Sequence, residues 1–179
     1  MNPDSVLGFW FVELRPAQWW RQDAALDRIV AQRFGGLHGR AIHGELFAWR
    51  KEARGRLAEI LVLDQFSRHI HRDTALAFAA DPMALALAQE ALAAGAAAQL
   101  APALRAFLYM PFMHSESAVI HDIALALFSE AGLEASLESE REHKAIIDRF
   151  GRYPHRNRAL GRTSTAEERE FLREQGLPD

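Results

Sequence analysis

The apolar positions of this chain recur every three or four residues rather than every two. Alanine and leucine supply most of them, and β-branched residues are sparse. A spacing of three to four places side chains on one face of a helix, and alanine and leucine are strong helix formers. The pattern therefore predicts an all-α protein with no strand.

Local signals in the first half of the chain predict helices over 6–14, 23–34, 40–49 and 53–70. We expect the second helix to end at the pair Gly35 and Gly36, because glycine is common just past the end of a helix. The stretch Ile-Leu-Val-Leu at 60–63 makes the fourth helix apolar on every side. We therefore expect the fourth helix to lie at the centre of the fold.

The second half predicts helices over 81–95, 100–110, 116–131 and 137–150, and a short last one after Thr165. Asp81 is expected to cap the first of these, and Pro111 is expected to break the second. Ser115 is a candidate cap for the third, and Thr165 with Glu168 forms a capping box for the last. The connections are short, so neighbouring helices should lie antiparallel.

Composition narrows the class of protein. The chain has 179 residues, of which 49% are hydrophobic and 25% charged, with no cysteine and a net charge of −3. This length favours one domain, 1–179, and the lack of cysteine excludes disulfides and thiol chemistry. No secretory signal and no apolar run of about 20 residues is present, so we expect a cytoplasmic protein without a membrane span. The slightly acidic balance makes broad nucleic-acid binding an unfavoured function.

Asp64 directly follows the apolar stretch at 60–63, where a charged side chain is unfavourable. It lies three and four residues after Leu61 and Ile60, on a face that is otherwise expected to be buried. A buried carboxylate needs a partner, and Arg68 stands one turn further along the helix. Asp64 and Arg68, with Gln65, could form a structural pair. The alternative is a carboxylate that faces a pocket.

Two histidines have surroundings that allow a functional role. His114 lies between a stretch of aromatic and methionine side chains and a helix start, where it could be a buried hydrogen-bonding link or a ligand. His143 shares a helix face with Ile147 and Phe150 and points toward the core or a cleft beside it. No histidine pair has the spacing of a helix-borne metal motif, so no metal and no cofactor is expected. A metal site would require the fold to bring Asp64, His114, Glu116 and His143 together.

The segment 149–162 contains five arginines and no acidic residue. Arginine forks bind carboxylates and phosphates, and His155 and Asn157 add further donors at the turn after Pro154. One interpretation is an anion site that includes Arg152 and Arg156. The other is that these arginines bind helix-end carbonyls and acids such as Asp64 or Glu116.

Several motifs in a fixed order resemble one known family. They are Leu63-Asp64-Gln65-Phe66 with Arg68, Met110-Pro111 with His114-Ser115-Glu116, and Phe150-Gly151-Arg152-Tyr153-Pro154-His155-Arg156-Asn157 with Leu160-Gly161-Arg162. With these motifs the chain is similar to the bacterial family of unknown function numbered 924. The resemblance implies a TPR-like stack of antiparallel helices and brings no established activity. The chain departs from the family pattern at Ser67 and His69, where the family usually has proline and asparagine.

The awkward polar residues are also the residues of these motifs, so we group them as one candidate ligand site. Its members are Asp64, Gln65, Arg68, His114, Glu116, Arg152, His155, Arg156 and Asn157, with His143 added from its helix face. The same cluster could equally be a buried polar network that fixes the stacking of the helices.

These residues support two functional hypotheses. The first is a binding or scaffold protein that recognises an anionic small molecule or an acidic peptide through Arg152 and Arg156. The second is a hydrolase or transferase in which His114 or His143 acts as general base and Asp64 or Glu116 orients it. A purely structural bundle that binds a protein partner is a third class, and the sequence leaves the oligomeric state open.

Overall fold

The structure, a computed structural model, describes residues 1–178 and contains helices and no strand in that range. The helices are α1 (Pro3–Gly8), α2 (Pro16–Trp19), α3 (Ala24–Ile42), α4 (Ala53–Leu61), α5 (Ser67–Ile70), α6 (Asp81–Ala93), α7 (Pro102–Met113), α8 (Ala118–Phe128), α9 (Glu134–Phe150) and α10 (Ala166–Glu174). The predicted all-α class is confirmed. The TPR-like arrangement and the single domain stay predictions.

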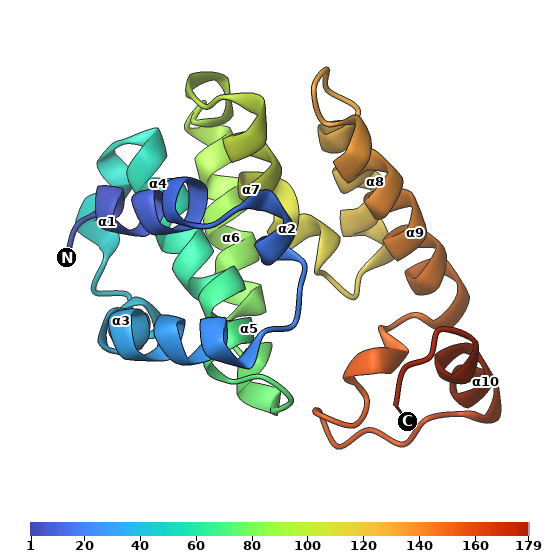
Figure 1. Ribbon diagram of the computed structural model, residues 1–179. Helices are drawn as coiled ribbons and strands as arrows, with labels where there is room; N and C mark the ends of the chain where they lie inside the picture. The colour runs from blue at the N-terminus through green and yellow to red at the C-terminus, as the bar shows by residue number, and fades with distance from the viewer. Residues whose placement is uncertain (179) are drawn as a thin grey trace.

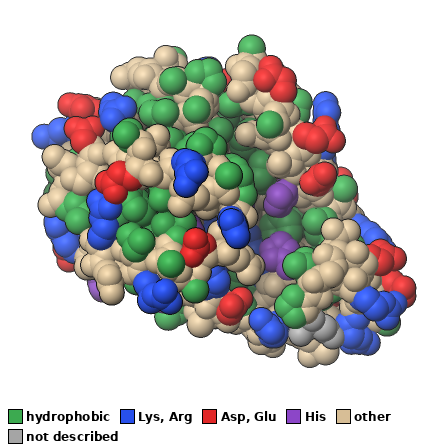
Figure 2. Space-filling model, in the orientation of Figure 1, with side chains coloured by type: hydrophobic (Ala, Val, Ile, Leu, Met, Phe, Trp, Pro, Cys, Tyr) green, Lys and Arg blue, Asp and Glu red, His purple; other side chains and the backbone are tan. Residues whose placement is uncertain are grey.

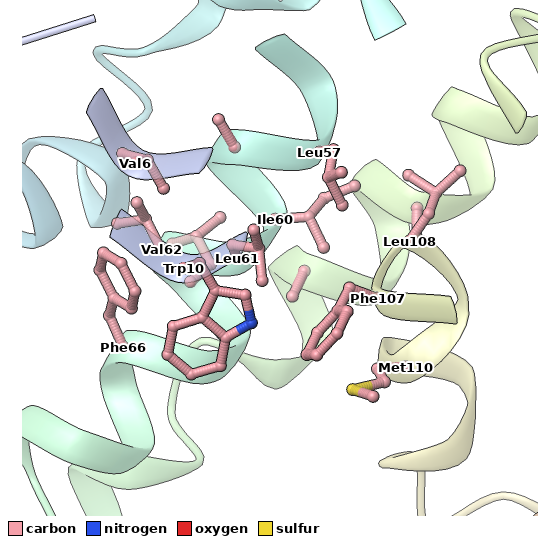
Figure 3. Close-up of a cluster of buried hydrophobic side chains, with 14 of the residues drawn as sticks. Val6, Trp10, Leu57, Ile60, Leu61, Val62, Phe66, Phe107, Leu108 and Met110 are labelled. Carbon is pink, nitrogen blue, oxygen red and sulfur yellow. The ribbon is translucent and has the colours of Figure 1, made fainter. Parts of the chain in front are cut away.

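The helix predicted over 53–70 forms and lies at the centre. It consists of α4, a π-helical turn over Val62–Phe66, and α5, without a break between them. Its side chains pack against α1, α6 and α7 in an apolar core, part of which Figure 3 shows around Trp10, Phe66 and Phe107. A central position explains why this segment is apolar on every side.

The predicted end of a helix at Gly35 and Gly36 is wrong, because α3 continues through both glycines to Ile42. Each glycine inside a helix costs about 1 kcal/mol relative to alanine. Phe34 and Leu37 on either side of the pair are buried, and burying each stabilises by about 1.5–3 kcal/mol. Tertiary packing therefore outweighs the local glycine signal.

The helix predicted over 40–49 is also wrong. Instead, α3 ends at Ile42, the chain turns at Gly44 with a φ of 72°, and only a short 3₁₀ segment over Phe47–Lys51 follows. A φ in the left-handed region is one that glycine adopts at little cost. The helix therefore ends near Gly44 and not at Gly35 and Gly36.

The predictions made from Pro111, Asp81 and Ser115 in the second half of the chain are also wrong. Pro111 lies inside α7, two residues before its last residue, where its missing N–H removes one helical bond of the last turn. Asp81 is the first residue of α6 and Ala80 holds the cap position. Ser115 does not cap α8, which begins after Ser117. In contrast, the capping box of Thr165 and Glu168 is present at the start of α10.

Helix α7 joins two parts of the molecule. It packs against α4 and α6 on one side and against α8 and α9 on the other, and α8 and α9 lie side by side (Figure 1). After α9, Gly151 turns the chain in a left-handed conformation into the 3₁₀ segment Pro154–Arg156 and then α10. This arrangement brings the turn between α7 and α8 close to the segment that follows α9.

By length and composition alone, the segment Ala75–Ala93 is apolar enough to cross a membrane. Its Ala84, Ala88 and Ala91 side chains pack into the core of the protein. The core helix of a soluble protein has the same character. The segment is therefore consistent with a soluble protein.

Candidate functional site

The π-helical turn over Val62–Phe66 presents two of the predicted site residues, Asp64 and Gln65, from the central helix. Such turns are rare in proteins and occur frequently at functional sites, because the extra residue in the turn redirects its side chains. Asp64 is buried, with 1% of its side chain exposed. Gln65 donates from Nε2 to Oδ2 of Asp64 at 2.6 Å.

His114, at the end of α7, binds the other oxygen of this carboxylate. His114 Nδ1 lies 2.7 Å from Asp64 Oδ1. Within residues 1–178, Nε2 of His114 makes no hydrogen bond. The carboxylate therefore fixes one edge of the imidazole and leaves the other nitrogen unused.

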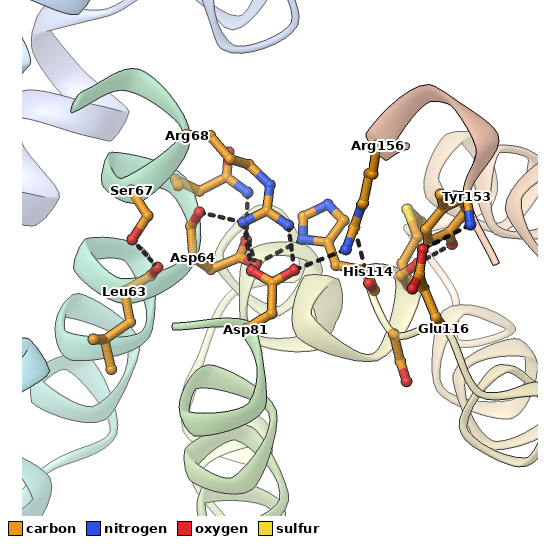
Figure 4. Close-up of polar contacts among 12 residues, drawn as sticks. Leu63, Asp64, Ser67, Arg68, Asp81, His114, Glu116, Tyr153 and Arg156 are labelled. Carbon is orange, nitrogen blue, oxygen red and sulfur yellow. Dashed lines mark hydrogen bonds and ion pairs between the residues drawn. The ribbon is translucent and has the colours of Figure 1, made fainter. Parts of the chain in front are cut away.

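Arg68 and Asp81 extend the network toward the C-terminal segment (Figure 4). Arg68 Nη1 donates to the Asp64 carbonyl oxygen at 2.6 Å and lies 3.2 Å from Asp64 Oδ1. Both Nη atoms of Arg68 also donate to Asp81, at 2.9 and 3.0 Å. Arg156 donates to Asp81 Oδ2 at 3.0 Å and to the His114 carbonyl oxygen at 2.9 Å. Two arginines thus face two carboxylates, and the cluster is close to neutral.

The surroundings of Asp64 and His114 shift both pKa values downward. Burial on its own would raise the pKa of Asp64, but the charge of Arg68 and the bond from His114 outweigh it and hold the pKa well below its usual range. Burial lowers the pKa of His114, although Asp64 opposes this effect. Near pH 7 the pair is therefore a carboxylate and a neutral imidazole. Because the carboxylate only accepts, the imidazole hydrogen is on Nδ1 and Nε2 carries a lone pair.

His114 borders two cavities. One, of about 350 Å³, is lined by Trp20, Met110, Met113, Ala135, Ser136, Ser139, His143 and His114, and we call it the His114 cavity. The second, of about 390 Å³, lies against Asp81, Glu116 and Arg156. Figure 2 shows histidine side chains on the wall of a hollow in this face, with apolar side chains around them. A ligand in the His114 cavity would contact four apolar side chains and the polar groups of two serines and two histidines.

His143 and His155 belong to the neighbourhood of the site without joining the Asp64 cluster. Nδ1 of His143 binds the Ser139 carbonyl oxygen at 2.7 Å, and burial lowers the pKa of His143. The rings of His143 and His155 both pack on the ring of Tyr153, with centroids 5.6 and 5.3 Å away. Burial and the charge of Arg156 lower the pKa of His155 to about 4. Both rings are therefore neutral near pH 7.

Glu116 binds an arginine of the acid-free segment 149–162, as one interpretation of that segment predicts, and it does not orient a histidine. Its carboxylate accepts from both Nη atoms of Arg162, at 2.6 and 2.9 Å, and from the Tyr153 backbone N–H at 2.7 Å. Arg162 Nε also donates to Asn157 Oδ1 at 2.9 Å. Glu116 and Asn157 therefore hold the segment after α9 against the turn before α8.

Arg152 lies apart from the Asp64 cluster. Its guanidinium binds both carboxylate oxygens of Glu168, at 2.6 and 2.8 Å, and the Thr163 carbonyl oxygen at 3.0 Å. Asn157 donates toward the same Glu168 at 3.4 Å. These bonds fasten α10 to the loop before it. Of the two arginines expected to recognise an anion, Arg152 thus binds Glu168 and Arg156 binds Asp81.

Two features of this region could not be predicted from local sequence spacing. The sequence predicts Asp81 as a helix cap, and its partner Arg156 is 75 residues away, so local spacing gives no signal of the pair. His121 and Glu140, on α8 and α9, are fully buried with Nδ1 and Oε1 2.6 Å apart. His121 Nε2 also lies 2.8 Å from the Ser115 carbonyl oxygen and 3.1 Å from the Tyr153 hydroxyl. A periodic pattern places both residues on helices but does not pair them.

In the described range, 1–178, no group of three or more His, Asp or Glu side chains is arranged to hold a metal ion. Glu116, which could have joined Asp64, His114 and His143 in such a group, is bonded to Arg162 instead.

Comparison with known proteins agrees with the resemblance seen in the motifs. The model of the family described as "Bacterial protein of unknown function (DUF924)" matches residues 6–176. The chain belongs to this family. A solved structure of a protein of unknown function, ATU0120 from Agrobacterium tumefaciens, is similar at 38% sequence identity with a TM-score of 0.91. The match covers 96% of this chain and 97% of that one. Among curated proteins, none matches.

Proposed function

We propose that the DUF924 chain is an acid–base enzyme, a hydrolase or transferase, in which His114 is the general base and Asp64 orients it. The observation that carries this proposal is the 2.7 Å bond from His114 Nδ1 to Asp64 Oδ1, beside a cavity that His114 lines. A buried carboxylate that fixes one ring nitrogen leaves the other directed to a reactant.

The proton transfer follows from this geometry. Nε2 of His114 takes a proton from water, or from the hydroxyl or amine of an acceptor, as that oxygen or nitrogen attacks the substrate. Asp64 stabilises the imidazolium that forms and keeps its own charge. The same proton then passes from Nε2 to the leaving group. Positioned proton transfer of this kind contributes about 10²–10⁴-fold to a rate.

The lowered pKa of His114 supports this role. A base must be unprotonated at the working pH, and burial keeps the ring neutral near pH 7. His143 lines the same cavity and is also neutral, but its Nδ1 binds a carbonyl oxygen rather than a carboxylate. His114 is therefore the better base of the two, because a carboxylate stabilises the protonated ring more strongly than a carbonyl does.

Anion recognition through Arg152 and Arg156 has less support. Each guanidinium already binds a carboxylate at 2.6–3.0 Å, so an anion that bound through the same nitrogens would have to displace Glu168 or Asp81. Displacing a partly buried carboxylate leaves it without a partner, which is costly. For the compartment we propose the cytoplasm, on the composition of the chain.

The test uses a panel of p-nitrophenyl esters, phosphates and glycosides with the parent protein, a His114→Ala variant and an Asp64→Asn variant. A His43→Gln variant is the control, because His43 is exposed and bonds only within its own helix. For the substrate that the parent protein turns over, we expect the rate to fall by about 10²-fold or more in both site variants and to stay unchanged in the control. Turnover that survives His114→Ala would contradict the proposal.

A further inference from the structure

A separate cavity, of about 420 Å³, lies between the turn after α5 and the segment 155–159, and we call it the Arg158 cavity. Three arginines line it: Arg68, Arg72 and Arg158. Asp73 is the only acidic residue among its lining residues within 1–178. This wall is therefore richer in hydrogen-bond donors than in acceptors.

Several of these donors are unused. Arg72 binds Asp27 through Nε and Nη2, at 2.6 and 2.7 Å, so its Nη1 remains open within residues 1–178. Arg68 uses both Nη atoms on Asp81 and makes no described bond from Nε. The three arginines come from two different parts of the chain, and all three line this cavity.

Among the arginines of the acid-free segment 149–162 that line a cavity, Arg158 has the weakest bond to a carboxylate. Its described carboxylate partner is Asp73, at 4.0 Å, and both side chains are more than half exposed. A pair at that distance in water contributes little. The Arg158 guanidinium can therefore turn to a ligand without leaving a buried carboxylate unpaired, unlike Arg152 or Arg156.

We infer that the Arg158 cavity binds the phosphate group of a phosphorylated small molecule. A phosphate monoester offers three terminal oxygens, which suits donors arriving from three guanidiniums, whereas a carboxylate is satisfied by one arginine fork. Phe78, Ala77 and Ala159 form an apolar part of the wall that can contact the organic portion of the ligand. The inference does not depend on the chemistry of His114.

His155, which also lines this cavity, adds a neutral polar group. Its pKa of about 4 means that it adds no positive charge to the site near pH 7. A neutral imidazole can donate one hydrogen bond to a phosphate oxygen. Attraction for the dianion therefore comes from the arginines, and binding should weaken as salt concentration rises.

Phenyl phosphate is the probe for this site, because it combines the dianion with a flat apolar group. Binding is measured by isothermal titration calorimetry at fixed ionic strength, with benzoate and sodium sulfate as comparison ligands. We expect saturable binding of phenyl phosphate and a loss of about tenfold or more in Arg158→Ala. Arg158→Lys should recover only part of it, since lysine lacks the fork, and Arg158→Glu should abolish it.

Two controls separate this site from general charge effects and from the proposed enzyme. Arg141→Ala removes an exposed arginine on α9 that lines no such cavity, and it should bind as the parent does. His114→Ala should also bind phenyl phosphate unchanged, so failure of one proposal leaves the other standing. The inference is overturned if the parent shows no saturable binding, if benzoate binds as tightly, or if Arg141→Ala loses as much as Arg158→Ala.

Discussion

The carboxylate of Asp64 and the ring of His114 are joined by a 2.7 Å hydrogen bond across fifty residues of sequence. Asp64 comes from a π-helical turn in the central helix, and His114 is the residue directly after α7. The bond therefore depends on how α7 packs against the central helix. It ties the buried central helix to the edge of the His114 cavity.

Replacing Asp64 by asparagine keeps the shape of the side chain and removes its charge. We expect a loss of about 2 kcal/mol in the free energy of unfolding, because bonds to a charged group are lost. Activity should fall by about 10²–10⁴-fold, because the imidazole loses the group that stabilises its protonated form. Urea denaturation and the substrate panel measure the two effects.

The control for that variant is Asp148→Asn, at a half-exposed carboxylate that binds Lys144 on the same helix. Its stability should change by less than about 0.5 kcal/mol. If Asp64→Asn behaves like the control in both measurements, Asp64 is neither a structural link nor an orienting group.

Glu168 predicts a pH dependence of stability. The bonds from Arg152 and from the Thr165 backbone lower its pKa from 4.5 to about 2. Above pH 4.5 the carboxylate is charged in both the folded and unfolded states, and its full contribution is present. Between pH 4.5 and 2 the unfolded chain takes up the proton first, so stability falls. Denaturation midpoints at a series of pH values should show this loss, and Glu168→Gln should reduce its slope.

The buried pair of His121 and Glu140 predicts strong coupling. Removing one partner leaves a polar group without its bond in a sealed position, so His121→Leu and Glu140→Leu should each cost about 3–5 kcal/mol. The double variant should cost much less than the sum, because neither group is then left alone. A double-mutant cycle from chemical denaturation gives the coupling. Additive single effects would mean that the two residues do not act as a pair.

Two glycines in helices predict opposite effects of the same substitution. A Cβ on Gly55 would lie 2.0 Å from the Trp49 carbonyl oxygen, so Gly55→Ala forces the backbone apart and should cost about 1–3 kcal/mol. A Cβ on Gly39, inside α3, meets no atom within 4 Å. Gly39→Ala should stabilise by about 0.5–1 kcal/mol. Thermal unfolding of both variants checks the pair, and a stabilising Gly55→Ala would contradict the packing described.

Structural features whose residues lie within a few positions of each other in the sequence could be predicted. The capping box of Thr165 and Glu168 spans four positions and starts α10 as expected. The pair of Asp64 and Arg68 follows from a spacing of four on a helix, and the two groups lie 3.2 Å apart. In both cases the two partners lie within about one turn of each other along the chain.

Features that depend on packing between distant segments could not be predicted from spacing. Gly35 and Gly36 signal a helix end locally, but the buried side chains around them carry α3 past both. The resemblance to the family grouped Asp64 with His114, and nothing in their own spacing did so. Asp81 is a further example, because its position at the start of a helix gives no sign that its carboxylate binds both Arg68 and Arg156.

The most direct test of the central claim is the protonation of His114, followed by ¹H–¹⁵N NMR on protein with ¹⁵N-labelled histidine. At pH 7.5 we expect a neutral ring with its hydrogen on Nδ1 and an unprotonated Nε2, and we expect Asp64→Asn to weaken that preference. A hydrogen on Nε2 in the parent protein, or a ring that is still charged at pH 7.5, would contradict the assignment of His114 as a general base oriented by Asp64.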